Sequence, residues 1–87
     1  MYLIDKDVSF RDLNDHAIIV NIRTGFYYSL NGSATAVFHG IRRGLRNDEI
    51  ARGLTEKYAV DEESARSDVR ECVDTFIKEK IVIETEA

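Results

Sequence analysis

Few side chains in this 87-residue sequence could carry out covalent chemistry, and they are scattered along it. Cys72 follows helical spacing with apolar neighbours, which favours packing over nucleophilic attack because free cysteines are commonly buried. His16 and His39 have no cysteine or carboxylate cluster at metal-ligand spacing. Ser29 and Ser33 lack a visible base partner. The sequence therefore predicts no catalytic residue, no metal site and no cofactor.

The segment 26–31 offers a different chemistry, that of an unprotected strand edge. Alternation divides it into a face with Phe26, Tyr28 and Leu30 and a face with Tyr27 and Ser29. The segment contains no Lys, Glu or Pro, the residues that usually protect an exposed sheet edge. Such an edge can accept a peptide as an additional strand. The alternative is that the first face simply belongs to the core, which we expect for Leu30 and for one or two of the others.

The composition is that of one small globular domain spanning residues 1–87, with 44% hydrophobic and 32% charged residues. The net charge of -4 argues against nucleic acid as a partner, because phosphate contacts need clustered Lys and Arg. No apolar run approaches the ~20 residues that a membrane helix needs. The single cysteine excludes an internal disulfide and is typical of a cytoplasmic protein.

The first thirty residues carry the period-two pattern of strands. The pattern predicts an antiparallel meander over residues 8–13, 16–22 and 26–30. Asn14-Asp15 marks the first turn, and Thr24-Gly25 supplies the positive φ of the second.

The remaining chain predicts three helices and a final extended run. Asn31, Asn47 and Asp61 are the expected caps, and Gly44 ends the first helix. The expected apolar stripes are Ala34, Val37, Phe38 and Ile41, then Ile50, Leu54 and Tyr58, then Ala65, Val69, Cys72, Val73, Phe76 and Ile77. The run Ile81–Ile83 should fold back on the core. The expected fold is α+β, in the order β-β-β-α-α-α.

Two groups of arginines allow more than one interpretation. Arg42, Arg43 and Arg46 are either cations that stabilise a helix C-terminus or a contact with an anion or partner. Arg66 and Arg70 can pair with acids of a bound peptide, or with Glu62 and Asp74 of their own helix. The third helix, expected over 61–80, carries seven acids and four bases, so it is poorly suited to reading DNA.

Several motifs together resemble the PqqD-like family over about residues 5 to 83. They are Ile18-x-Val20-x-Ile22-x-x-Gly25-x-Tyr27-x-x-Leu30-Asn31-x-x-Ala34, Asp48-Glu49-Ile50, Leu54-x-x-x-Tyr58 and Asp68-Val69. The resemblance implies a winged helix-turn-helix domain with an N-terminal three-stranded sheet. The form Gly25-x-Tyr27-x-x-Leu30-Asn31 is closer to the stand-alone proteins of lasso-peptide pathways than to the pyrroloquinoline quinone protein.

The resemblance also implies a role as a recognition element for ribosomally made, post-translationally modified peptides. Such domains bind a precursor's leader peptide as a strand beside the third strand, in a cleft against the third helix. Here that strand is Phe26–Leu30, and the helix wall falls near Arg66, Val69, Arg70 and Val73. The implied enzyme partner is a leader peptidase, a cyclase or a radical SAM enzyme. One departure is Glu79-Lys80, where the family often has a glycine.

Two other interpretations stay open on the sequence alone. One is a DNA-binding winged helix regulator. The other is a dimer in which the 26–30 edge pairs with a second copy of itself; we expect a monomer or a weak dimer.

Overall fold

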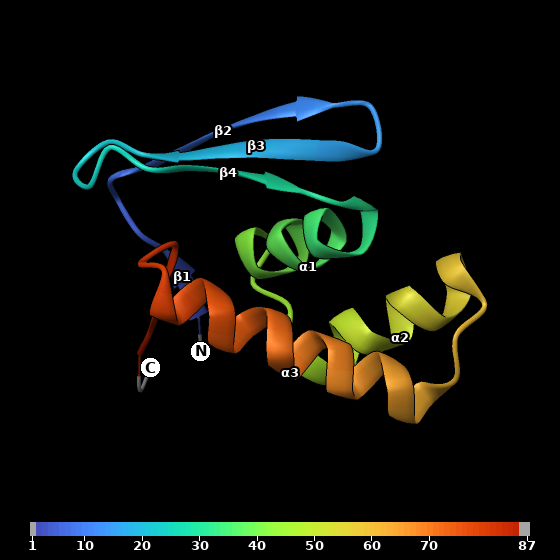
Figure 1. The fold of residues 1–87 in the computed structure, drawn as a ribbon. Helices are drawn as coiled ribbons and strands as arrows, with labels where there is room; N and C mark the ends of the chain where they lie inside the picture. Colours follow the sequence, from blue (N-terminus) through green and yellow to red (C-terminus); the bar gives the residue numbers. More distant parts are fainter. Residues whose placement is uncertain (1, 86–87) are drawn as a thin grey trace.

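Three antiparallel strands form a sheet over a layer of three helices in the computed structural model, which describes residues 2–85 (Figure 1). In chain order the elements are β1 (Tyr2–Ile4), β2 (Val8–Leu13), β3 (His16–Asn21), β4 (Tyr27–Leu30), α1 (Gly32–Arg42), α2 (Asn47–Tyr58), α3 (Glu62–Lys78) and β5 (Val82–Glu84). The helices lie on one side of the β2-β3-β4 sheet and leave its other face uncovered (Figure 1). The expected α+β fold with an N-terminal three-stranded sheet and three helices is confirmed.

Both predicted turns of the meander are present. Leu13 pairs with His16 across a two-residue turn in which Asn14 has φ +60°. Gly25, with φ +81°, lies in the β3–β4 connection and donates its N–H to the carbonyl of Asn21. That connection spans 22–26, so β3 and β4 are each one residue shorter at this end than the pattern predicts.

Side-chain caps begin α1 and α3 as expected. Asn31 Oδ1 accepts from the Ala34 N–H at 2.9 Å, and Asp61 Oδ1 accepts from the Ser64 N–H at 2.7 Å. The predicted cap of α2 is wrong by one position, because Asn47 is already its first helical residue.

At the start of α2 the N-cap is Arg46. Its N–H donates to the Glu49 side chain at 2.9 Å, the half of a capping box in which the third helical residue reaches back to the cap's own backbone.

The helices close over one core that also takes in the inner face of the sheet. Phe38 of α1 packs edge-on against both Phe10 and Phe76. The other buried apolar side chains include Ile19, Leu30, Val37, Ile41, Ile50, Leu54, Ala65, Val69, Val73, Ile81 and Val82. Most of the predicted helix stripes therefore face the core, whereas Ala34, Cys72 and Ile77 are half-buried and Tyr58 is exposed.

The two ends of the described chain form a second sheet that the sequence did not predict in full. β5 was expected as an extended run, but its partner β1 was not expected; Leu3 pairs with Ile83 and Ile4 with Val82. The chain reverses between α3 and β5 at Lys80, whose φ of +64° is the left-handed conformation usually taken by glycine. A lysine in this conformation carries a cost in backbone strain. Within residues 2–85, no helix is long and apolar enough to cross a membrane.

Candidate functional site

The outer edge of β4 is the most distinctive polar feature of the molecule. β4 pairs with β3 on one side, from Ala17 with Leu30 to Val20 with Tyr27, and no other strand within residues 2–85 pairs with it. The C-terminal β5 pairs with β1 instead, so it does not cover this edge. Backbone donors and acceptors of β4 are therefore available to another chain.

The pairing parity identifies which backbone groups face outward. The Asn21 N–H donates to the Phe26 carbonyl at 2.9 Å, so Phe26 directs its carbonyl toward β3. Backbone groups alternate along an antiparallel strand, which turns Tyr28 and Leu30 toward β3 as well. The N–H and C=O groups of Tyr27 and Ser29 consequently face the free edge.

Aromatic and aliphatic side chains lie exposed beside this edge. Tyr27 is 74% exposed on the outer face, opposite Val20 of β3. Phe26 and Ile22 are 64% and 69% exposed in the connection before β4. Phe26 lies just before the regular strand, which begins at Tyr27, and its exposure shows that it is not part of the core.

On the inner face, Tyr28 joins the edge strand to the end of α3. Its hydroxyl donates to Glu79 Oε2 at 2.9 Å, and Glu79 is the C-cap of α3. Burial, then the hydrogen bond and charge of Glu79, raise the pKa of Tyr28. The phenol therefore stays protonated and serves as the donor in this contact.

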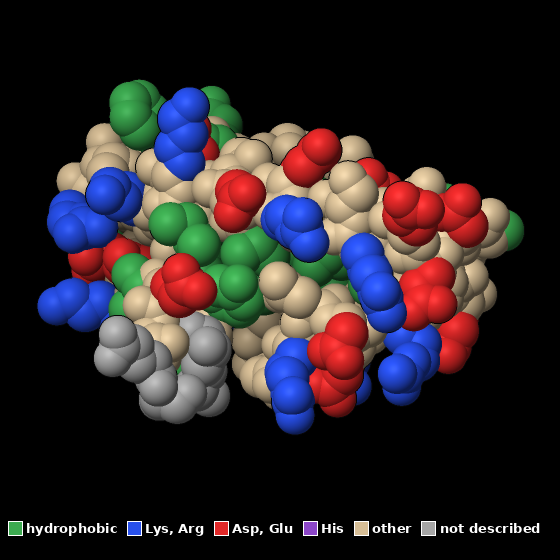
Figure 2. All heavy atoms as spheres, turned by 90° about the horizontal axis from the view of Figure 1, so that it is seen from below, with side chains coloured by type: hydrophobic (Ala, Val, Ile, Leu, Met, Phe, Trp, Pro, Cys, Tyr) green, Lys and Arg blue, Asp and Glu red, His purple; other side chains and the backbone are tan. Residues whose placement is uncertain are grey.

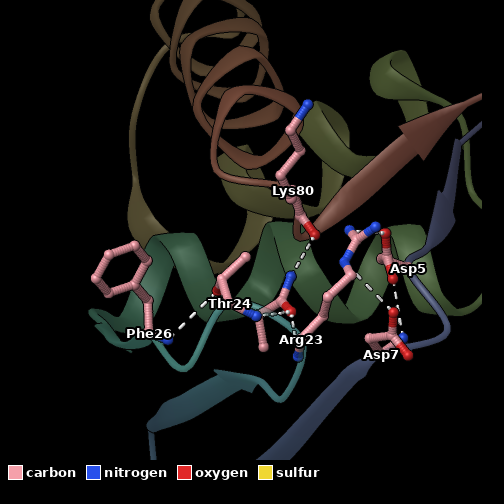
Figure 3. A network of polar contacts seen from close by, with 7 residues as sticks. Asp5, Asp7, Arg23, Thr24, Phe26 and Lys80 are labelled. Atoms are coloured by element: carbon pink, nitrogen blue, oxygen red, sulfur yellow. Dashed lines mark hydrogen bonds and ion pairs between the residues drawn. The ribbon is translucent and has the colours of Figure 1, made fainter.

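Asn21 makes a second junction between the sheet and the end of α3. Its side chain is fully buried; Nδ2 donates to the Lys80 carbonyl at 3.0 Å, and Oδ1 accepts from the Arg23 and Thr24 amides at 2.9 and 3.2 Å (Figure 3). This residue is not among those that the sequence predicted for the site. The sequence did contain a clue to its role: an asparagine stands at an inward-facing position of an otherwise apolar strand. A buried amide needs several hydrogen-bond partners, so such a residue is expected to join neighbouring segments.

The β3–β4 connection is also attached to the linker between β1 and β2. Arg23 Nη2 lies 3.3 Å from Asp5 Oδ2, and Arg23 Nε lies 3.5 Å from Asp7 Oδ2 (Figure 3). With the Asn21 contacts, these ion pairs hold the start of β4 from two directions.

The four residues expected to form the helix wall do not form one surface. Val69 and Val73 are 0% and 2% exposed, so they belong to the core and offer no surface to a peptide in this structure. Arg66 and Arg70 are exposed, but they line a hollow of about 150 Å³ with Asn47 and Asp48 at the start of α2.

Helix geometry explains why the arginines lie away from β4. Arg70 and Glu79 are nine positions apart, about two and a half turns, and so project from opposite flanks of α3. Glu79 is the residue that reaches Tyr28. Arg66 instead pairs with Glu62 of its own helix at 2.7 Å, which was one of the two predicted alternatives.

The candidate reactive side chains are held in structural contacts. Burial and the nearby Asp68 raise the pKa of Cys72 to about 11, which leaves the thiol protonated and poorly nucleophilic. His39 Nδ1 accepts from Arg42 Nε at 3.3 Å, so Nε2 carries the proton toward Asp12 Oδ1, 2.6 Å away. No group of three or more His, Cys, Asp or Glu residues in the described part of the chain could hold a metal ion.

Arg42 also stacks over the Phe10 ring, with its guanidinium carbon 4.6 Å from the ring centroid. It is a basic residue of the last turn of α1, as the helix-end interpretation of the arginine cluster requires.

Two other surface features lie apart from the β4 edge. A hollow of about 440 Å³ lies between α1, α2 and the β2–β3 turn, and acids such as Glu49 and bases such as Lys57 both line it. The face seen from below exposes hydrophobic side chains grouped among acidic and basic ones (Figure 2). Leu3 and Ile83, which pair across the second sheet, are about half exposed.

An open strand edge above a three-helix layer defines a small module of the winged helix class. The family model described as coenzyme PQQ synthesis protein D (PqqD) matches residues 16–82. This chain therefore belongs to the PqqD family, and the resemblance found in the sequence is confirmed.

Two solved structures have the same fold. TbiB1 in complex with the TbiA(beta) leader peptide superimposes with a TM-score of 0.88 and 19% identity, over 97% of this chain and 98% of that one. Lasso peptide synthetase B1 complexed with the leader peptide gives a TM-score of 0.88 and 19% identity, over 95% of this chain and 98% of that one. Comparison with curated proteins returned no match.

Proposed function

We propose that residues 1–87 act as one non-catalytic recognition domain that captures the leader of a ribosomally made precursor peptide. The leader adds as a strand to the free edge of β4. The observation that carries this proposal is the outward direction of the Tyr27 and Ser29 backbone groups at an edge that no strand of residues 2–85 covers. Two proteins of similar fold are found in complexes with leader peptides, which supports leader binding as the role of this fold.

Backbone pairing supplies affinity that depends little on leader sequence. Tyr27 and Ser29 together offer two donors and two acceptors. Four hydrogen bonds at roughly 0.5–1.5 kcal/mol each contribute about 2–6 kcal/mol. The exposed rings of Phe26 and Tyr27 lie beside this ladder and can bury apolar leader side chains.

The proposed mechanism requires no bond chemistry. The domain holds the leader and so keeps the attached core peptide near a maturation enzyme at an effective concentration of about a millimolar. That enzyme is a leader peptidase, a cyclase or a radical SAM enzyme of a cytoplasmic pathway, with lasso-peptide pathways the nearest parallel. Within the segment Phe26–Leu30, we assign the backbone contacts to Tyr27 and Ser29. Val69 and Val73 support α3 from inside the core.

Amide hydrogen exchange tests the proposal at single residues. The probe is a peptide isolated from a displayed library of short random peptides panned against the protein. Its binding should slow exchange at the Tyr27 and Ser29 amides, while Tyr28 and Leu30 should change little because they already pair with β3. Unchanged exchange at both outward amides in the complex would refute strand addition, as would a folded protein that enriches no peptide.

Matched substitutions at one position give an independent test. Ser29→Pro removes an outward N–H and blocks an incoming strand, at a site where an edge strand tolerates proline. Ser29→Ala keeps that N–H and removes only the hydroxyl. The proline variant should bind the peptide at least about tenfold more weakly, and the alanine variant within about twofold of the original. Equal affinities of the two variants, with thermal unfolding showing both folded, would contradict the model.

A further inference from the structure

The Tyr28–Glu79 contact indicates which leader side chains the domain prefers; this inference rests on the proposed function. A strand added beside β4 would alternate its side chains between the two faces of the sheet. Those on the inner face would lie on the same side as Tyr28, whose hydroxyl reaches Glu79 at 2.9 Å. An inward leader side chain beside Tyr28 therefore approaches the Glu79 carboxylate.

Glu79 has a free acceptor for such a side chain. Its Oε2 accepts from Tyr28, whereas Oε1 has no hydrogen-bond or ion-pair partner among residues 2–85. Glu79 is half-buried, where an ionised oxygen gains more from a charged donor than it would in open water.

The adjacent cations do not form ion pairs with Glu79. Neither Lys78 nor Lys80 forms an ion pair with it within the described residues. In Figure 3 the Lys80 side chain extends away from the Asn21 contact while its carbonyl remains there. The arginines of α3 lie on its opposite flank beside α2, where they are not placed to pair with Glu79.

We propose that Glu79 is a specificity-determining residue that selects leaders with a lysine or arginine at the inward position beside Tyr28. The Tyr28 hydroxyl orients the carboxylate and leaves one oxygen for the leader cation. The preferred ligand is therefore a peptide that pairs through its backbone and carries a basic side chain at one defined register.

Panning one displayed library of short random peptides against a set of variants tests this selection. A peptide is scored only if it no longer binds when Ser29→Pro is introduced. This criterion restricts the comparison to peptides that bind at the β4 edge. The original protein should enrich Lys and Arg at one position. Glu79→Gln keeps an acceptor for Tyr28 and removes the charge, and should bind those peptides about tenfold more weakly. Glu79→Lys should shift the preference to Asp and Glu.

Two controls separate charge from packing. Glu63→Lys makes the same charge change in the first turn of α3, and Tyr28→Phe removes the hydroxyl but keeps the carboxylate; both should retain the basic preference. If the original protein and Glu79→Lys enrich the same residues, the selection by Glu79 is refuted while peptide capture stands. If the original protein enriches no edge-dependent peptide, capture itself fails.

Discussion

Replacing Asn21 with alanine tests whether the buried amide joins the sheet to the end of α3. The substitution removes three hydrogen bonds, one to the Lys80 carbonyl and two from the Arg23 and Thr24 amides. At roughly 1 kcal/mol net for each bond, the loss is about 3 kcal/mol. Small domains have free energies of unfolding of roughly 0.05–0.15 kcal/mol per residue, so this is a large share of the total.

Urea denaturation followed by circular dichroism measures the effect. Asn31→Ala is the matched control, because it removes an exposed helix cap that accepts one backbone hydrogen bond and should cost only about 1 kcal/mol. Hydrogen exchange adds a local readout, since the Arg23 and Thr24 amides should lose protection in the Asn21 variant while the α2 amides keep theirs. Equal costs of the two substitutions, or unchanged exchange at Arg23 and Thr24, would refute the structural role assigned to Asn21.

Three further predictions follow from burial, backbone conformation and charge. Val69→Glu places a carboxylate at a fully buried position and should unfold the domain, seen as loss of the cooperative thermal transition; a folded variant with weakened peptide binding would instead place Val69 at the binding surface. Lys80→Gly relieves a left-handed residue and should raise the free energy of unfolding by about 0.5–1 kcal/mol in urea titrations, and a decrease would contradict this reading. The hydrogen bond from Ser64 lowers the pKa of Asp61, so the stability it provides is present above the unfolded-state pKa and is lost as pH falls through the folded-state pKa. Asp61→Asn should flatten that acid dependence in unfolding measured from neutral to acidic pH, and an unchanged profile would assign it to other carboxylates.

Signals within a few residues were enough to predict most elements. Asn14 and Gly25 take the positive φ values that their turns require, and Asn31 and Asp61 cap their helices. These predictions succeeded because a turn or a cap is satisfied by backbone groups two or three positions away. The prediction for Asn47 was wrong because α2 begins one residue earlier than expected, and the N–H of the cap residue Arg46 finds its acceptor in Glu49.

The predicted helix wall on α3 was less accurate than the predicted turns and caps. A family resemblance indicates which positions correspond, but it does not indicate whether their side chains are exposed. Val69 and Val73 already belonged to the apolar stripe that the periodicity assigned to the core, and the core is where they lie. Arg66 and Arg70 lie on the flank of α3 near α2. The contact with the edge strand comes from Glu79, which the sequence marked only as a departure from the family pattern.

The sequence alone determined the alternation of residues 26–30 and the lack of edge-protecting side chains, because both follow from residue type and a period of two. Only the tertiary structure decided that this edge stays open. The C-terminal strand could have covered it, but pairs with Tyr2–Ile4, about eighty positions away in the chain. Which flank of α3 meets β4 was likewise fixed by helix packing. Such pairings depend on contacts between distant residues, and no local pattern records them.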